Sequence, residues 1–237
     1  MLTIAIFTFK RFESLLRCIN SIQSKHVGEI LIFNDDEDNM LQKTDFNIDY
    51  PIRVFNPITF GFEGRKFRKP MYINKAINLS KYDKILFTDD DGVFNVDTID
   101  LHHKYLQNYK FVAGSIIRSK FIKRKSKNIL QGTNYSFDRE FLLSVGGYNE
   151  LFSDSSGGGD PEFWYRIYNF VSENKIPVVY LYSAVQQVIG IQSRDKREKK
   201  LTPCEVFESI HNFRPKGKMY NWFPEIRKKS NWMTTIR

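Results

Sequence analysis

The stretch Ile-Leu-Phe-Thr-Asp-Asp-Asp-Gly-Val-Phe, residues 85–94, decides the fold, because an apolar run leads directly into three adjacent carboxylates. Unit charges about 4 Å apart repel by about 4 kcal/mol at an effective dielectric near 20, so a compensating cation is expected. Side chains alternate along an extended chain, so Asp89 and Asp91 can face one ligand while Asp90 points elsewhere. Their hard oxygen atoms suit Mg²⁺ or Mn²⁺. The pattern predicts a strand that ends at a divalent metal site, and a solvated acidic turn is the alternative.

Apolar runs and helical spacings alternate around this stretch. The runs expected to be strands are residues 3–9, 29–33 and 52–55, and the spacings expected to be helices are residues 11–23 and 71–79. This alternation predicts an α/β fold with a mostly parallel sheet and right-handed crossovers. In such sheets ligands bind beyond the carboxyl ends of the strands, where Asp35, Asp36 and the 89–91 triplet are expected.

The second half of the chain continues the pattern and adds positive charge. We expect helices at 98–107 and 139–145, with Gly146-Gly147 ending the latter, and strands at 111–117 and 178–182. Residues 118–127 carry six Lys and Arg and no acid. From Arg194 onward the chain is rich in Lys and Arg, with Trp222, Phe223 and Trp232 interleaved. The expected division is a body over 1–193 and a basic extension over 194–237.

The composition limits the class of protein. A chain of 237 residues with 41% hydrophobic content can bury a sizeable core. A net charge of +9 and a pI near 9.4 favour a polyanionic partner. Cys18 and Cys204 have no zinc or disulfide spacing. Since no run approaches the roughly 20 apolar residues of a membrane span and the first residues do not form a secretory signal, we expect a cytoplasmic protein.

A second constellation reads Gly-Gly-Gly-Asp-Pro-Glu-Phe-Trp-Tyr-Arg, residues 157–166. A run of glycines lets the backbone approach a ligand closely. Asp160 and Glu162 enter a helix whose first turn favours negative charge, with Pro161 well placed at its start. The alternative is that Asp160 only caps this helix.

Ordered motifs over residues 3–170 resemble nucleotide-sugar glycosyltransferases of the GT-A fold, in particular the family-2 group. The matching segments are residues 6–17, the strand 29–36 with its carboxylates, Asn74-Lys75-Ala76-Ile77, the D-x-D motif of Asp89 to Asp91, Gly146-Gly147-Tyr148-Asn149-Glu150, and Gly159-Asp160-Pro161-Glu162-Phe163 ahead of Arg166. The resemblance implies a Rossmann-like, mostly parallel central sheet flanked by helices. It also implies a nucleotide-sugar part over about 1–95 and an acceptor part over about 96–193.

The resemblance implies a role for each matching residue. Asp89 and Asp91 would hold Mn²⁺ or Mg²⁺, and Asp160 would be the catalytic base of an inverting transfer from a nucleoside-diphosphate sugar, with a UDP-sugar favoured. The residues expected to bind the donor are Thr8, Phe9, Arg11, Asp35, Asp36, Arg65, Asn74, Asp89 and Asp90. The residues expected at the acceptor are Lys123, Arg124, Lys125, Glu162 and Trp164.

Three positions depart from the family pattern. Gly159 stands where an acid usually precedes the base. Ile73 stands where a basic residue is common, so Arg65, Lys66, Arg68 or Lys69 could contact phosphate instead. No histidine follows the 178–182 strand until His211, which leaves the third protein ligand of the metal open.

Other functions remain alternatives. The basic segment predicts an anionic acceptor, with hydroxymethylated DNA favoured over a cell-surface or lipid-linked glycan at a membrane surface. Asp89-x-Asp91-Gly92 also fits haloacid-dehalogenase-like phosphatases, but those carry the pattern on their first strand. Nucleotidyltransferases need a glycine-rich N-terminal loop, and residues 8–14 contain no glycine. A nucleic-acid-binding module would leave both carboxylate clusters without a purpose.

Overall fold

The computed structural model describes residues 1–62, 68–118, 132–154, 159–189, 202–215 and 232–236. Of the predicted site residues, Arg65, Lys123, Arg124 and Lys125 lie outside these ranges, as does most of the basic segment 118–127.

Four parallel strands form the N-terminal half of the sheet. They are β1 (Leu2–Thr8), β2 (Val27–Asn34), β3 (Ile52–Phe55) and β4 (Lys84–Asp89). The helix α1 (Phe12–Asn20) follows β1, and α2 (Lys69–Leu79) precedes β4, with the short turns η1 (Lys43–Asp45) and η2 (Pro57–Phe60) between β2 and α2. Because Thr8 pairs with Asn34 and Phe7 with Asp89, the carboxyl ends of β1, β2 and β4 meet at one edge of the sheet.

The C-terminal half mixes strand directions. Its elements are β5 (Gly92–Phe94), α3 (Thr98–Tyr105), β6 (Phe111–Arg118), β7 (Tyr135–Asp138), α4 (Arg139–Val145), η3 (Glu150–Asp154), α5 (Gly159–Asn174), β8 (Val178–Val188), α6 (Pro203–His211) and β9 (Thr234–Ile236). The strand order is β3-β2-β1-β4-β7-β6-β8-β5, and β9 pairs with β8. Since β7 runs antiparallel to both β4 and β6, it joins the N-terminal strands to the rest of the sheet.

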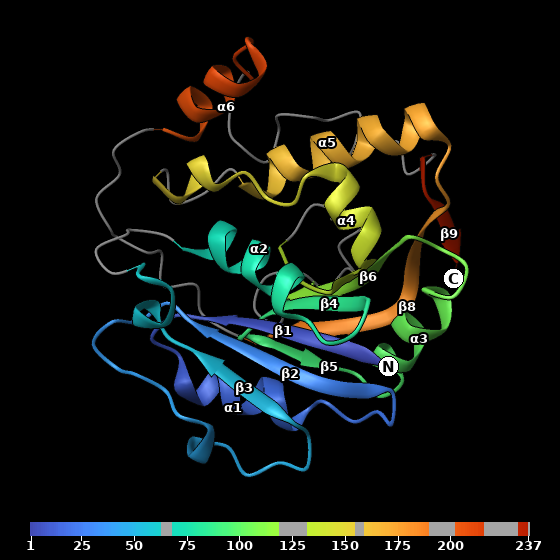
Figure 1. Cartoon of the computed structure of the whole chain (residues 1–237). Coiled ribbons are helices and arrows are strands. Elements are labelled where there is room, and N and C mark those ends of the chain that lie inside the picture. The colour runs from blue at the N-terminus through green and yellow to red at the C-terminus, as the bar shows by residue number, and fades with distance from the viewer. Residues whose placement is uncertain (63–67, 119–131, 155–158, 190–201, 216–231, 237) are drawn as a thin grey trace.

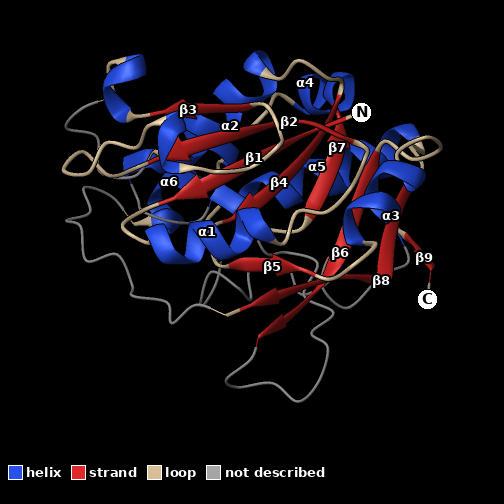
Figure 2. Cartoon of the chain, turned by 90° about the horizontal axis from the view of Figure 1, so that it is seen from below, coloured by secondary structure: helices blue, strands red, loops and turns tan. Residues whose placement is uncertain are grey.

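Helices cover both faces of the sheet. Figure 1 shows α2, α4 and α5 on one face and α1 on the other, and Figure 2 shows α1 from below. Alternation along β1 sends Phe7 into the core under α2, α4 and α5, and sends Ile4 and Ile6 into the core shared with α1 and α3. Each fully buried side chain of this size stabilises the fold by about 1.5–3 kcal/mol.

The described parts of the predicted extension pack onto the body. In α6, Val206 and Phe207 are buried in the core cluster that also contains Phe163 and Trp164 of α5, and β9 extends the sheet beside β8. These contacts attach residues 202–215 and 232–236 to the body of the protein. Among the described helices, none is long and apolar enough to span a membrane.

Candidate active site

Both acidic clusters lie where the strands β1, β2 and β4 end. The amide of Asp35 donates to the carbonyl of Thr8 at 2.8 Å, and the amide of Asp90 donates to the carbonyl of Phe7 at 3.2 Å. Backbone pairing therefore continues one residue past β2 and β4 and brings the two clusters to the same edge of the sheet. This edge is where the sequence placed them.

Asp90 is the buried member of the triplet. It accepts a hydrogen bond of 2.6 Å from the hydroxyl of Thr8, and its other oxygen lies 2.6 Å from Arg11 Nη2. Burial raises the pKa of Asp90 to about 7, although Arg11 and Thr8 both favour the ionised carboxylate. Asp90 therefore binds the β1–α1 connection rather than solvent.

Arg11 also contacts Asp91. Strand alternation predicts that Asp89 and Asp91 face the same partner, but in the structure Asp90 and Asp91 share Arg11. Arg11 Nη1 donates to Asp91 Oδ2 at 3.1 Å. The physical reason is that β4 ends at Asp89, and Asp90 and Asp91 lie in a turn where the alternation of an extended strand no longer applies. Asp89 alone is at the strand end and faces a different partner.

That partner is Lys69, the first residue of α2. Its ammonium lies 2.5 Å from Asp89 Oδ1 and donates to the carbonyl of Gly132 at 3.1 Å. A Cβ on Gly132 would lie 2.7 Å from Lys69 Nζ and 2.5 Å from Asp160 Oδ2, so a side chain at this position would displace one of these two groups. Burial lowers the pKa of Lys69, but Asp89 and Asp160 outweigh this effect and raise it overall, so the ammonium is charged.

Lys69 therefore lies close to both acidic motifs, the 89–91 triplet and Asp160, which are about 70 residues apart in the sequence. Asp160 is the second residue of α5 rather than part of the turn before it, and it accepts a hydrogen bond of 3.1 Å from the hydroxyl of Tyr148. The hydroxyls of Tyr148 and Tyr135 lie 2.8 Å apart. Burial raises the pKa of Asp160, and Lys69 opposes that rise, so Asp160 is a better proton acceptor than an ordinary aspartate.

Glu162 and Trp164 do not reach the surface of this site. Glu162 is fully buried and forms two hydrogen bonds with Arg166, at 2.6 and 3.0 Å, and a contact of 3.1 Å with His211 Nε2. Trp164 packs in the core, with ring centroids 5.1 Å from Phe111 and 5.5 Å from Tyr135. Their burial is the physical reason that the acceptor proposal below does not include them. His211, the first histidine after the predicted 178–182 strand, contacts Glu162.

Arg166 fixes the turn that follows α4. Its guanidinium donates to the carbonyls of Val145 and Gly147, at 2.5 and 2.7 Å. These carbonyls lie at the C-terminus of α4, where cations are favoured, and Gly146 ends the helix with φ of 87° as predicted. Arg166 thus supports the segment that carries Tyr148.

Asn74 supports the same segment from α2. Its amide donates to the carbonyl of Tyr148 at 2.9 Å and to Glu150 at 2.8 Å, and its side-chain oxygen accepts from the amide of Tyr148 at 2.8 Å. The Asn74 side chain therefore bonds to the 148–150 segment and not to groups at the strand ends. Asn74 therefore positions Tyr148, a role that the predicted donor contact did not include.

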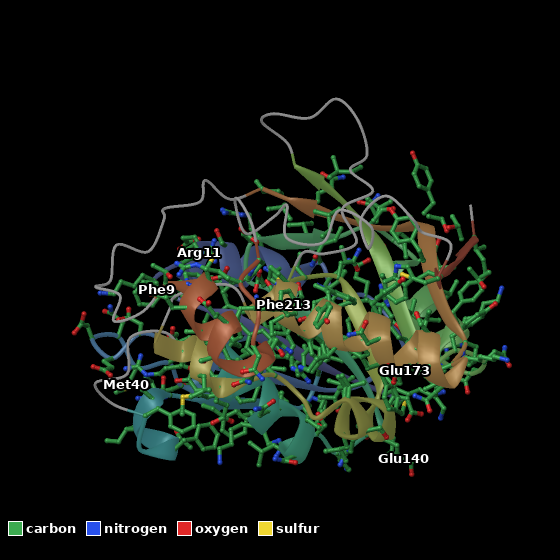
Figure 3. All side chains as sticks on the ribbon, turned by 90° about the horizontal axis from the view of Figure 1, so that it is seen from above. Phe9, Arg11, Met40, Glu140, Glu173 and Phe213 are labelled. Atoms are coloured by element: carbon green, nitrogen blue, oxygen red, sulfur yellow. The ribbon has the colours of Figure 1, made fainter. Side chains whose placement is uncertain are left out.

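A cavity of about 470 Å³ lies beside the ends of β1 and β2. It is lined by Thr8, Lys10, Arg11, Phe12, Asn34, Asp36, Asn39, Leu41 and Asp45. Its volume is typical of small-molecule sites, and it includes the predicted donor residues Thr8, Arg11 and Asp36. Figure 3 shows Phe9 and Arg11 close together, at the opposite end of the molecule from Glu140 and Glu173.

Asp35 and Asp36 have separate partners at this end. Arg68 Nη1 lies 2.9 Å from Asp35, and the same guanidinium contacts Glu37 and donates to the carbonyl of Phe62 at 2.7 Å. Asp36 accepts a hydrogen bond of 2.7 Å from Asn39. Arg68 is thus committed to anchoring the start of α2, which leaves the next residue, Lys69, directed at Asp89.

The acidic site suits a divalent metal whose other ligands come from a substrate. Among the described residues, no group of three or more His, Cys, Asp and Glu is arranged to hold a metal ion. Mg²⁺ is commonly bound by one or two carboxylates together with substrate phosphates. Asp89, which is 29% exposed, and Asp91, which is 8% exposed, provide such a pair.

Comparison with known proteins agrees with this architecture. The sequence profile of glycosyl transferase family 2 matches residues 3–170. No curated protein matches the chain. Residues 1–349 of S. aureus TarS, solved in complex with UDP-GlcNAc, superpose with a TM-score of 0.65 at 12% identity, over 87% of this chain and 63% of that one. This chain therefore spans less than two thirds of the TarS fragment.

A second solved structure has the same fold. The mannosyltransferase PcManGT from Pyrobaculum calidifontis, in complex with GDP-Man and Mn²⁺, superposes with a TM-score of 0.60 at 14% identity, over 95% of this chain and 67% of that one. At these identities the likeness concerns the fold, and it confirms the GT-A architecture that the sequence motifs predicted.

Proposed function

Because this chain belongs to glycosyl transferase family 2, we propose that it transfers a sugar from a nucleoside-diphosphate sugar to an acceptor hydroxyl in a metal-dependent reaction. One observation carries the proposal. Asp89 at the end of β4 contacts the Lys69 ammonium, and Asp160 at the start of α5 lies close to the same ammonium, so a candidate metal-binding carboxylate and a candidate base share one site. The family match also removes the phosphatase alternative.

The chain's own residues divide the chemistry. Asp89 and Asp91 would hold the metal, which supplies positive charge that stabilises the departing diphosphate. Asp160 accepts the proton of the acceptor hydroxyl as the oxygen attacks the anomeric carbon. The bond from that carbon to the diphosphate breaks, and its electron pair leaves with the diphosphate. Attack opposite the leaving group inverts the anomeric configuration.

The nucleoside is proposed to bind in the cavity beside β1 and β2. Thr8 and Arg11 line this cavity and also contact the acidic triplet, so they connect the nucleoside end to the metal end of the donor site. Asp36 offers a carboxylate for the ribose hydroxyls. TarS was solved with UDP-GlcNAc and PcManGT with GDP-Man, so UDP- and GDP-sugars are the first donors to test, with UDP-sugars favoured.

For the acceptor we propose an anionic molecule. The support is the net charge of +9 and the run of Lys and Arg over residues 118–127, which includes Lys123, Arg124 and Lys125. In the sequence this segment leads into Gly132, which lies between Lys69 and Asp160. Hydroxymethylated DNA is the favoured candidate, and a phosphorylated or lipid-linked glycan is the alternative.

A donor screen tests the reaction. Purified protein with Mn²⁺ is offered a panel of UDP- and GDP-sugars, and release of nucleoside diphosphate is measured with each acceptor class and without acceptor. We expect one donor to be consumed faster than the others, with a product of inverted configuration. If no donor is turned over with any acceptor, the proposed sugar transfer is wrong. If the product retains the anomeric configuration, the role of Asp160 as base of an inverting transfer is wrong.

A further inference from the structure

We propose that Lys69 competes with the divalent metal for Asp89 in the free protein, so that the metal binds tightly only together with the nucleoside diphosphate. The inference rests on the proposed function and concerns the order in which that site is filled. Its basis is the position of the ammonium, 2.5 Å from Oδ1 of Asp89, one of the two carboxylates proposed to hold the metal.

Lys69 is a fixed part of this site rather than a loose surface cation. Its side chain is 17% exposed, and its ammonium has a second acceptor, the carbonyl of Gly132 at 3.1 Å. By contrast, the Arg11 side chain on the other two carboxylates is 28% exposed. Arg68, the residue before Lys69, is held by Asp35, so the backbone of Lys69 is fixed at the start of α2 while its side chain can still rotate.

The charges of the cluster explain why the competition is incomplete. Four carboxylates gather at this site. Arg11 contacts Asp90 and Asp91, and Lys69 contacts Asp89 and lies near Asp160. Such a concentration of carboxylates attracts a divalent cation even while Lys69 holds Asp89. An ammonium and a metal ion on the same carboxylate nevertheless repel each other, and this repulsion weakens metal binding.

A nucleoside diphosphate removes the conflict because it brings new anionic oxygens. When phosphate oxygens are present, Lys69 can exchange Asp89 for phosphate, or shift toward Asp160, and its charge then supports binding of the donor. Metal and nucleotide should each increase the affinity of the other by the same factor, as thermodynamic linkage requires. This competition would keep the affinity of the free protein for the metal low until a donor is bound.

The test measures Mn²⁺ binding to the full chain, without nucleotide and with UDP or GDP, by titration calorimetry and by the electron spin resonance signal of free Mn²⁺. Lys69→Met keeps the length of the side chain and removes its charge, and Lys69→Gln is a second variant should the first not fold. Lys75→Met is the matched control, because Lys75 lies on the same helix but its ammonium sits over the rings of Phe60 and Phe62.

We expect Lys69→Met to lower the Kd of Mn²⁺ for the nucleotide-free protein about tenfold, or about 1.4 kcal/mol. The factor by which nucleotide improves Mn²⁺ binding should shrink correspondingly, while Lys75→Met behaves as wild type. Unchanged or weaker Mn²⁺ binding by a folded Lys69 variant would overturn the inference.

Asp91→Asn separates the two levels of failure. If Asp91→Asn abolishes Mn²⁺ binding while Lys69→Met matches wild type, the metal site stands and only the competition is wrong. If Asp91→Asn leaves Mn²⁺ binding intact, the metal lies elsewhere, and both this inference and the proposed metal site are wrong.

Discussion

The hydroxyl of Tyr148 donates a hydrogen bond of 3.1 Å to Asp160, and this contact orients the carboxyl group that we propose as the base. Tyr148 itself is held by the side chain of Asn74, which forms two hydrogen bonds with the backbone of Tyr148. The site therefore includes a supporting layer, from α2 through Tyr148 to Asp160, that fixes the base relative to the strand ends.

Replacing Tyr148 by Phe should slow transfer and shift its pH dependence. The hydrogen bond favours the ionised form of Asp160, so its loss raises the pKa of Asp160 further. The acid limb of kcat/KM should move to higher pH, and kcat at neutral pH should fall about tenfold, equivalent to about 1.4 kcal/mol. Tyr135→Phe is the control, since it leaves the bond to Asp160 in place. An unmoved acid limb in Tyr148→Phe would refute the orienting role.

Replacing Asp160 by Asn should remove the base and leave the donor site intact. General-base catalysis typically contributes 10²–10⁴-fold, so transfer should fall by at least about 10²-fold. Binding of UDP or GDP in the presence of Mn²⁺, measured by calorimetry, should stay within a few fold of wild type. Near-normal turnover of this variant would assign the base to another residue.

Asp90→Asn should change how stability depends on pH. Because burial raises the folded-state pKa of Asp90 to about 7, the protonated group stabilises the fold; this contribution is complete below about pH 4 and is lost as pH rises through about 7. Asparagine does not titrate. Measured in chelator, the Tm of Asp90→Asn minus that of wild type should therefore increase from pH 5 to pH 8. A constant difference would show that Asp90 is already ionised throughout.

Arg166→Met should destabilise the fold because it leaves Glu162 buried and without its main partner. Breaking a buried ion pair by removing one member costs about 3–5 kcal/mol. The double variant Glu162→Gln, Arg166→Met should recover part of this loss in urea unfolding. If the double variant is as unstable as Arg166→Met, the cost comes from the lost contacts with Val145 and Gly147 rather than from the stranded charge.

The sequence predicts the half of the fold that is built from long apolar runs. The strand at 52–55 and the helix at 139–145 match β3 and α4 at both ends. The strands β5 and β7 were not predicted, because each pairs with strands that are far away in the sequence, β5 with β8 and β7 with β4 and β6. The helix α6 was not predicted within the basic extension, although Val206 and Phe207 are buried in the core.

The sequence predicts the acidic residues of the candidate site. It predicts only some of the residues that hold them in place. Lys69 was one of four cations considered for phosphate, and sequence alone cannot show which of them reaches Asp89. Tyr148 was noted only within a glycine-containing turn. Trp164 is predicted at the acceptor, but in the structure its ring packs in the core against Phe111 and Tyr135.

The central claim is that Asp89 and Asp91 bind a metal on which sugar transfer depends. The most direct measurement is release of nucleoside diphosphate from the preferred donor, with Mn²⁺ and with excess chelator, for wild type and Asp91→Asn. We expect chelator to stop transfer by wild type, Mn²⁺ to restore it, and Asp91→Asn to lose at least about 10²-fold with Mn²⁺ present, since the metal stabilises the charge of the leaving group. Undiminished transfer by wild type in chelator, or by Asp91→Asn, would contradict the account.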